Sequence, residues 1–315
     1  MPTSVPLEAP VRLSGFVPPL CTPFTPGGDV DTGSLRRLVE HLLAGGASAL
    51  FALGTSGEAA HLTAGQRRTV VRTVVEAAGG RVPVLAGVID MTTPRVLEHA
   101  RDAAEAGADV LVATAPFYSG VHPEETAGHF RCVRGGGGLP LLAYDIPSSV
   151  HSKLPGEVLL SLASEGTLVG LKDSSGDTNA LRRLLVERRL RGLESSFSVL
   201  TGSELTVDAA LLMGADGVVA GLGNVDPAGY ARVCALSRAG DWKAAVAEQD
   251  RLAALFALVE AGSGISWTAS AIGGFKVALR LLGVIDCAAT APPLGALGEE
   301  GVRVVRELLV EAGLL

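Results

Sequence analysis

Short runs of apolar residues alternate with longer segments of helical period along the chain up to about residue 220. The predicted strands are 16–20, 49–53, 82–86, 109–113, 139–144, 168–171, 197–200 and 217–220. The segments between them repeat apolar residues at helical spacing, which predicts helices at 31–43, 63–78, 92–106, 123–133, 155–163 and 203–213. Parallel strands need such crossover helices, and both faces of each strand become buried. The pattern therefore predicts an α/β fold, a (β/α)8 TIM barrel, with Thr63 as the N-cap of the second helix.

A doubly wound open sheet is the main alternative to the barrel. Against it, the first strand is followed by no Gly-x-Gly-x-x-Gly, and the chain has no Walker A lysine. After Pro227 only helical patterns occur, at 230–239, 241–261, 269–282 and 297–312. We therefore expect an N-terminal tail at 1–14, a barrel carrying the active site at 15–225, and the last barrel helix with a C-terminal helical appendage at 226–315. Four consecutive glycines at 135–138 predict a flexible loop.

Composition and charge narrow the classes of function. The 315 residues are 48% hydrophobic and 19% charged, which is an ordinary globular balance. The formal net charge is −7 without a long basic run, which argues against nucleic acid or an anionic membrane surface as a partner. The first 14 residues contain three prolines and no apolar signal-peptide core, and the longer apolar stretches are broken by glycine. We therefore expect a cytoplasmic protein.

The chain contains cysteines and histidines, but their spacing along the sequence matches no known metal-binding motif. The four cysteines form no Cys-x-x-Cys pair and are interpreted as reduced core thiols: Cys21, Cys132, Cys234 and Cys287. The six histidines form no His-x-His or His-Glu-x-x-His pattern, so no metal site is predicted. A group of arginines predicts a solvated helix face: Arg182, Arg183, Arg188, Arg189 and Arg191.

One lysine stands at the end of the sixth predicted strand. The apolar run containing Leu168 and Leu171 delivers Lys172 into a polar turn with Asp173 and Asp177, which are interpreted as loop and N-cap groups. Such a strand brings an amine to the rim of a barrel, where desolvation favours the neutral form that attacks a ketone to give a Schiff base. The simpler interpretation is that Lys172 ends the strand and extends its amine into water.

Three other predicted strands also end in polar or aromatic residues, and functional groups of a barrel cluster at these ends. Gly54-Thr55-Ser56-Gly57-Glu58 follows the second strand, Pro116-Phe117-Tyr118 the fourth, and Tyr144 to Ser149 the fifth. Hydroxyl groups and backbone amides in the first motif are suited to binding a carboxylate, although the motif is equally suited to a simple helix entry. Tyr144 and Tyr118 have the alternative interpretations of a core aromatic residue and of loop packing.

In combination and order, these motifs resemble one family, the pyruvate-dependent class I aldolases that include dihydrodipicolinate synthase and N-acetylneuraminate lyase. The resemblance rests on Gly54 to Glu58, on Tyr144 with Ile146-Pro147, on Gly170-Leu171-Lys172-Asp173, on Thr201-Gly202 and on Asp216 to Val219. It extends from Gly15 to the C-terminal helices. The resemblance implies a carbon–carbon lyase that makes or cleaves a bond between pyruvate and an aldehyde.

The resemblance also implies roles for individual residues. Lys172 would form the Schiff base, Tyr144 would relay a proton, and Thr55 would link Tyr144 to Tyr118 from a neighbouring subunit. Thr55 and Ser56 would hold the pyruvyl carboxylate, and Val219 would lend a carbonyl group. Gly202, Ser149 and Glu204 complete the predicted substrate-binding residues. No cofactor beyond the covalent lysine is expected. The partners would be small molecules, in a homo-oligomer that is a dimer or a tetramer.

Departures from the family pattern bear on the substrate. Dihydrodipicolinate synthases carry an arginine where this chain has Ser149, and the loss of a guanidinium removes a carboxylate anchor. Neuraminate lyases carry an Asp-Glu pair near the position of Glu204-Leu205. A small hydroxylated aldehyde, or a 2-keto-3-deoxy sugar acid in the cleavage direction, therefore fits best. The alternatives are dihydrodipicolinate synthesis, a 2-keto-acid dehydratase, a metal-dependent or hydratase-type enzyme, and a catalytically silent keto-acid sensor.

Overall fold

Eight parallel strands form one sheet in the order β1-β8-β7-β6-β5-β4-β3-β2. The computed structural model describes residues 11–315, so positions 1–10 of the predicted N-terminal tail lie outside the described residues. The strands are β1 (Gly15–Phe16), β2 (Leu50–Ala52), β3 (Val84–Gly87), β4 (Val110–Ala113), β5 (Leu141–Asp145), β6 (Gly170–Asp173), β7 (Ser198–Thr201) and β8 (Gly217–Val218). A parallel bridge between Pro19, just after β1, and Phe51 of β2 closes the ring. The predicted α/β barrel is confirmed.

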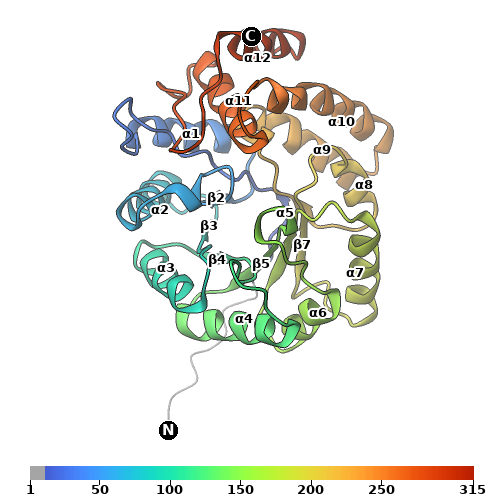
Figure 1. Ribbon diagram of the computed structural model, residues 1–315. Helices are drawn as coiled ribbons and strands as arrows, with labels where there is room; N and C mark the ends of the chain where they lie inside the picture. The colour runs from blue at the N-terminus through green and yellow to red at the C-terminus, as the bar shows by residue number, and fades with distance from the viewer. Residues whose placement is uncertain (1–10) are drawn as a thin grey trace.

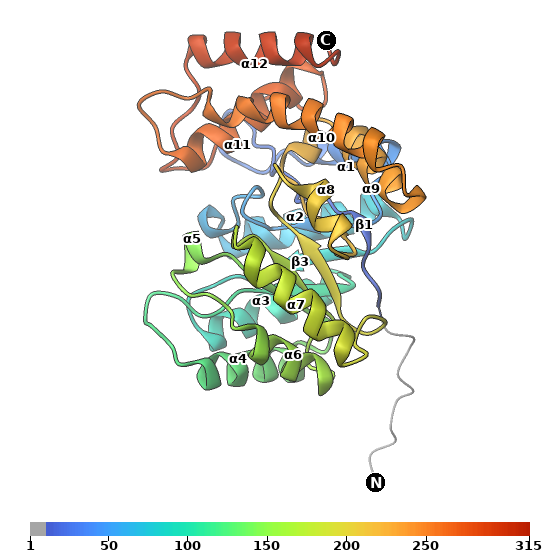
Figure 2. The same cartoon turned by 90° about the vertical axis from the view of Figure 1, so that its right-hand side faces the viewer.

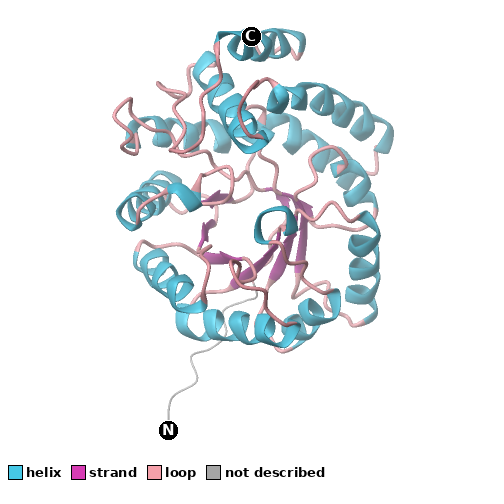
Figure 3. Ribbon diagram, viewed as in Figure 1, coloured by secondary structure: helices cyan, strands magenta, loops and turns pink. Residues whose placement is uncertain are grey.

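Helices surround the strands, as Figures 1 and 3 show in a view into the barrel. The outer helices are α1 (Thr32–Ala44), α2 (Ala64–Ala78), α3 (Thr93–Glu105), α4 (Pro123–Gly137), α6 (Gly156–Ser164), α7 (Thr178–Leu190), α8 (Val207–Leu212) and α9 (Pro227–Ala239). The short α5 (Pro147–Val150) follows β5 directly and carries Ser148 and Ser149. Short 3-10 turns lie at η1 (Ala59–His61) and η2 (Leu222–Asn224).

Local sequence explains where several helices begin. Thr63 caps α2, because its hydroxyl accepts the Gln66 amide while the Gln66 side chain accepts the Thr63 amide. Asp177 caps α7 by accepting the Ala180 amide at 2.9 Å. Both caps agree with the sequence-based prediction.

A separate group of residues fills the inside of the barrel. These side chains come from alternate strand positions, and they include Phe51, Leu85, Val112, Leu142, Tyr144 and Leu200. A second, larger cluster packs the outer faces of the strands against the helices. Burial on both faces explains why the strands read as continuous apolar runs.

The last part of the chain is helical and stacks at one side of the barrel (Figure 2). It consists of α10 (Trp242–Phe256), η3 (Ala257–Glu260), α11 (Trp267–Leu281) and α12 (Glu299–Glu311). The predicted helix 241–261 therefore divides into α10 and η3. Helix α11 is the most enclosed of these, since every residue from Ala269 to Leu279 is buried. Within residues 11–315, no helix combines the length and the apolar character that crossing a membrane would require.

The predicted flexible loop at 135–138 is wrong. Gly135, Gly136 and Gly137 continue helix α4, and only Gly138 leaves it, in the left-handed conformation with φ 71°. Packing explains the glycines, because a Cβ on Gly136 would lie 2.6 Å from Leu97 and a Cβ on Gly137 would lie 2.6 Å from Leu111. Gly136 and Gly137 therefore allow α4 to pack closely against its neighbours, and Gly138 caps the end of the helix.

Two predictions about side-chain exposure are also corrected. Arg188 was expected on a solvated face, but it is 3% exposed and forms an ion pair with Asp216, just before β8. The arginine compensates for its burial by donating to the carbonyl groups of Phe197 and Gly214. Of the four predicted core thiols, Cys21 and Cys234 are buried, whereas Cys132 is exposed.

Candidate active site

Lys172 lies inside β6 rather than in the turn after it, which corrects its predicted place. Its side chain is 4% exposed. The amine Nζ lies 4.0 Å from the ring centre of Tyr144 and 5.1 Å from that of Phe51. Tyr144 is close because strands β5 and β6 pair with Tyr144 directly opposite Lys172. No ion pair within residues 11–315 involves Lys172, so the amine lies among aromatic faces without a carboxylate partner.

The turn after β2 brings Thr55 to the same place. The Thr55 and Tyr144 hydroxyl groups are 3.0 Å apart and share a hydrogen bond. The turn is closed by the amide of Gly57, which donates to Gly54, and by the amide of Glu58, which donates to Thr55. In the described part of the chain, the amides of Thr55 and Ser56 donate to no protein acceptor. The turn thus presents two free N–H groups and two hydroxyl groups, which is the donor set that a carboxylate requires.

A cavity of about 210 Å³ lies against Lys172 and joins the barrel to the C-terminal helices. The barrel contributes polar groups to its lining: Thr55, Ser56, Tyr144, Ser148, Ser174 and Glu204. Helices α10 and α11 and the turn η3 contribute an apolar wall: Phe256, Val259, Trp267, Ala271, Ile272 and Phe275. Gly202 and Val219 also line this cavity. Apart from Lys172, its lining contains no cationic side chain.

A second cavity of about 200 Å³ shares Thr55 and Tyr144 with the first. Its lining includes Phe117 and Ser149. Ser149 therefore borders this neighbouring cavity, whereas Ser148 borders the cavity of Lys172. Both cavities therefore border the Thr55–Tyr144 hydrogen bond.

The Glu204 carboxylate is held in place by hydrogen bonds from neighbouring residues of the protein. Its Oε2 accepts the amide of Leu222 at 2.8 Å and the hydroxyl of Tyr230 at 3.2 Å. Burial raises the pKa of the Glu204 carboxyl to about 7, and hydrogen bonds from Leu222, Gly221 and Tyr230 and the charge of Lys172 oppose that rise. Glu204 therefore lies in the cavity with one oxygen already engaged, which leaves less of the carboxylate for a substrate hydroxyl than the sequence suggested.

Tyr118 does not reach the other predicted residues of its own chain. Its side chain is 91% exposed, and its backbone is left-handed with φ 82°. Tyr118 borders a surface groove together with Phe117, Met91 and Val121, and it lines neither of the two cavities at Tyr144.

Several residues at the site escaped the sequence analysis. The apolar wall comes from α10, η3 and α11, where nothing local separates a wall residue from an ordinary core residue. Lys276 was also missed, although a lysine within the apolar helix 269–282 was a usable signal, because lysine is almost never fully buried without a partner. Its partner is Glu58, at the end of the Thr55 turn.

The described residues contain no group of three or more His, Cys, Asp or Glu side chains arranged to hold a metal ion. The site itself offers a buried amine, a tyrosine–threonine hydroxyl pair and a set of hydrogen-bond donors suited to a carboxylate.

Comparison with known proteins identifies the family. The model of the dihydrodipicolinate synthetase family matches residues 12–312. A 4-hydroxy-tetrahydrodipicolinate synthase from Xanthomonas campestris is 35% identical over 244 residues, which cover 77% of this chain and 78% of that protein. A protein of the same name from Chlorobium limicola is 31% identical over 96% of this chain and 98% of its own length.

Solved structures agree with this result. YagE, a prophage protein of the dihydrodipicolinic acid synthase family from E. coli K12, was crystallised with pyruvate. It superposes with a TM-score of 0.89 at 26% identity, covering 97% of this chain and all (100%) of that one. The dihydrodipicolinate synthase of Acinetobacter baumannii gives a TM-score of 0.87 at 28% identity, covering 96% and 100%. The chain therefore belongs to the dihydrodipicolinate synthetase family and is a carbon–carbon lyase of the pyruvate-dependent class I aldolase type.

Proposed function

We propose that Lys172 forms a Schiff base with pyruvate and that the resulting enamine adds to an uncharged, hydroxylated aldehyde. The observation that carries this proposal is the position of the buried Lys172 amine against Tyr144, whose hydroxyl is hydrogen-bonded to Thr55. An unpaired amine beside a proton-relaying hydroxyl is the pair of groups that imine chemistry requires. No metal or organic cofactor takes part.

The reaction proceeds through balanced steps. The neutral amine adds to the ketone carbon of pyruvate, a proton moves from its nitrogen to the oxygen, and Tyr144 gives a second proton so that the oxygen leaves as water and the iminium forms. The Tyr144 phenolate then takes a proton from the methyl group, which gives the enamine, and the enamine carbon attacks the aldehyde. Tyr144 protonates the new alkoxide and recovers its proton from the water that hydrolyses the iminium, which releases the 4-hydroxy-2-keto acid and the free lysine. Cleavage of such a product is the same sequence reversed.

Residues around Lys172 have distinct roles in this proposal. The free amides and hydroxyl groups of Thr55 and Ser56 bind the pyruvyl carboxylate, with the Val219 carbonyl nearby. Thr55 passes the proton of Tyr144 onward to Tyr118 of a neighbouring subunit, because the exposed Tyr118 of the same chain borders neither cavity at Tyr144. The active form is accordingly a homo-oligomer.

The cavity lining supports an uncharged second substrate. Apart from Lys172, the lining offers no cation that could pair with an anionic aldehyde. Hydroxyl groups of Ser148, Ser174 and Thr268 are available to a hydroxylated aldehyde, while the apolar wall limits access of water. The cleavage substrate in the reverse direction is then a 2-keto-3-deoxy sugar acid.

A second candidate is the reaction named in the relatives, the synthesis of 4-hydroxy-tetrahydrodipicolinate from pyruvate and aspartate semialdehyde. The observation that favours it is the 35% identity over most of the chain. The serine at position 149, in place of the carboxylate-binding arginine, weighs against it.

Borohydride reduction with pyruvate tests the covalent step. The sequence contains four lysines, Lys153, Lys172, Lys243 and Lys276, so peptide mapping of the reduced adduct is unambiguous. We expect one pyruvyl adduct, on Lys172, that is absent from Lys172→Met and unchanged in Lys243→Met, which alters an exposed lysine. A folded protein without adduct would overturn the proposal.

A substrate screen tests the second half of the proposal. Purified protein with pyruvate is offered glyceraldehyde, erythrose and aspartate semialdehyde, and product is measured by mass. We expect addition to the hydroxylated aldehydes. Turnover confined to aspartate semialdehyde would establish the second candidate instead.

A further inference from the structure

The turn that carries Thr55 and Ser56 is flanked by two residues whose backbone conformations are energetically unfavourable. Leu53 has φ 59° and Glu58 has φ 57°, so both lie in the left-handed region although neither is glycine. Side chains of L-residues disfavour that region, and such residues persist only where the surroundings hold them. The contacts around the turn show what holds it.

A buried ion pair holds the end of the turn. The Lys276 amine of α11 pairs with Glu58 Oε1, and both side chains are completely buried (0% exposed). The amine also donates to the Ala289 carbonyl at 2.8 Å, and Glu58 Oε2 accepts the Ala291 amide at 2.6 Å. The pair joins the turn to the helix whose residues Ile272 and Phe275 form part of the cavity wall.

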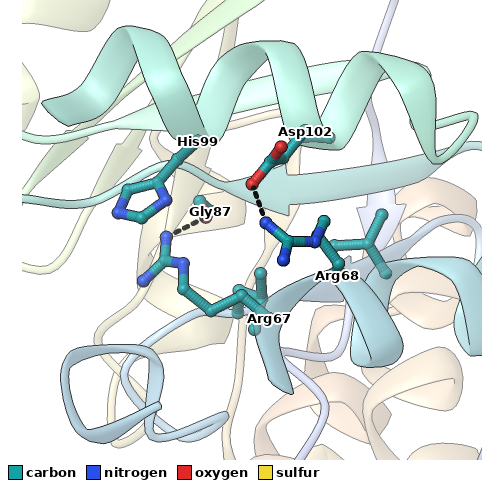
Figure 4. A pocket seen from close by; sticks show the side chains of 8 residues that line it. Arg67, Arg68, Gly87, His99 and Asp102 are labelled. Carbon is teal, nitrogen blue, oxygen red and sulfur yellow. Dashed lines mark hydrogen bonds and ion pairs between the residues drawn. The ribbon is translucent and has the colours of Figure 1, made fainter. Parts of the chain in front are cut away.

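A buried arginine holds the same end of the turn through Ala59, the residue after Glu58. Arg67 of α2 is 5% exposed and donates through one nitrogen to the Ala59 carbonyl and through another to the Gly87 carbonyl, each at 2.9 Å. Figure 4 shows the guanidinium group pointing at Gly87, the last residue of β3. Gly87 lets β3 approach the turn closely, because a Cβ there would lie 2.0 Å from the Leu53 carbonyl oxygen. Arg67 thus ties the turn to the neighbouring strand.

We propose that Lys276 and Arg67 are positioning residues, two buried cations that fix the turn so that Thr55 and Ser56 bind the pyruvyl carboxylate beside Lys172. The proposal rests on the proposed function, since it concerns the same site. Neither cation lines the cavity of Lys172, so both act through the turn, Lys276 by way of the Glu58 side chain and Arg67 by way of the Ala59 carbonyl. Without either cation, the turn relaxes from its left-handed conformation, and the free amides no longer converge on the carboxylate.

Arg188 provides a matched control. It is also a buried arginine that donates to two backbone carbonyl groups, those of Phe197 and Gly214, and it forms an ion pair with Asp216. These partners precede β7 and β8, so Arg188 lies at the amino ends of the strands, opposite the active site. Replacing Arg188 removes a comparable set of buried hydrogen bonds from the amino ends of the strands, where the arginine has no contact with the Thr55 turn.

The test measures borohydride trapping of the adduct against pyruvate concentration, together with the thermal midpoint. The variants are Arg67→Met and the pair Glu58→Gln with Lys276→Met, which avoids leaving one buried charge unpaired. We expect the half-saturating pyruvate concentration to rise about tenfold or more, because small misplacements of binding groups have effects of that size. Arg188→Met should lower the thermal midpoint and leave half-saturation unchanged. Arg67→Lys keeps the charge but lacks the forked donors, so its half-saturating pyruvate concentration should lie between those of the unaltered protein and Arg67→Met. This variant replaces Arg67→Met in the test if Arg67→Met does not fold.

The outcomes separate the two proposals. No adduct in the unaltered protein would overturn the proposed function and, with it, the positioning role. A normal adduct in the unaltered protein, with half-saturation in the Arg67 and Lys276 variants equal to that of Arg188→Met, would overturn the positioning role alone.

Discussion

At the scale of single residues, the candidate chemistry depends on one pairing between strands. Tyr144 and Lys172 face each other because β5 and β6 run in parallel with these two residues in register. A shift of one residue in either strand would turn one side chain to the outside of the barrel. The hydroxyl of Tyr144 then depends on a third residue, Thr55, 3.0 Å away on the turn after β2.

Replacing the Tyr144 hydroxyl tests the proton relay. Tyr144→Phe keeps the ring beside Lys172 and removes only the hydroxyl group. We expect kcat for aldol addition to fall by roughly two to four orders of magnitude, the usual contribution of general acid–base catalysis. Steady-state kinetics with the best aldehyde from the screen measures it, and Thr55→Val should lower kcat in the same direction. A Tyr144→Phe enzyme of near-normal kcat would exclude the relay.

The Glu204 carboxyl predicts a pH dependence of stability. Burial raises the pKa of Glu204 from the usual 4.5 to about 7, so the folded state favours the protonated form. The resulting stabilisation is complete below pH 4.5 and is lost as the pH rises through 7. We expect the thermal midpoint of the unaltered protein, relative to Glu204→Gln, to fall between pH 5 and pH 8, roughly the interval between these two pKa values. The exposed Glu299→Gln is the control, and an equal pH response in both variants would contradict the assignment.

At the level of helices and strands, short-range hydrogen bonds from capping side chains determine where several helices begin. Thr63 and Asp177 satisfy the first amides of their helices, and both were identifiable from sequence. Helix α4 differs, because its glycines had suggested a loop while packing against Leu97 and Leu111 requires them within the helix. The same residue type thus serves for close approach at Gly137 and for a left-handed cap at Gly138.

Alanine substitutions in the glycine run should have opposite effects on stability. A Cβ on Gly135 meets nothing within 4 Å, so Gly135→Ala should stabilise the protein by about 0.5–1 kcal/mol through helix propensity. Gly138→Ala should destabilise it by about 1 kcal/mol or more, because φ is 71° there. Urea unfolding followed by circular dichroism measures both. Equal effects of the two substitutions would mean that the run is a loop after all.

At the scale of the whole molecule, the active site combines parts that are distant in sequence. The barrel supplies the amine, the hydroxyl groups and the turn of Thr55 and Ser56, while α10, η3 and α11 supply the apolar wall of the cavity. One predicted participant, Tyr118, is 91% exposed in the single chain, and its role stays a prediction that requires a second copy.

Subunit complementation tests the role of Tyr118. Tyr118→Phe should lower kcat about a hundredfold, the lower range of a proton-transfer contribution. Lys172→Met should be inactive. If Tyr118 serves the neighbouring subunit, hybrids formed by mixing and refolding the two variants will contain sites with an intact lysine and an intact tyrosine, and activity will return. Mixed variants that stay inactive, while sedimentation shows that hybrids form, would place Tyr118 outside the reaction.

Local patterns in the chain were enough to predict the order of strands and helices, the caps at Thr63 and Asp177, and the motifs that mark the family. Those features are local, because strand burial, helix period and capping depend on residues within a few positions of one another. The tertiary structure alone decided which distant groups meet. Glu58 and Lys276 are 218 positions apart, and the apolar wall, the burial of Arg188 and the packing of the α4 glycines depend equally on chain segments brought together by folding. A pattern along the chain shows that a residue is buried, but its partner is set by the packing of whole elements.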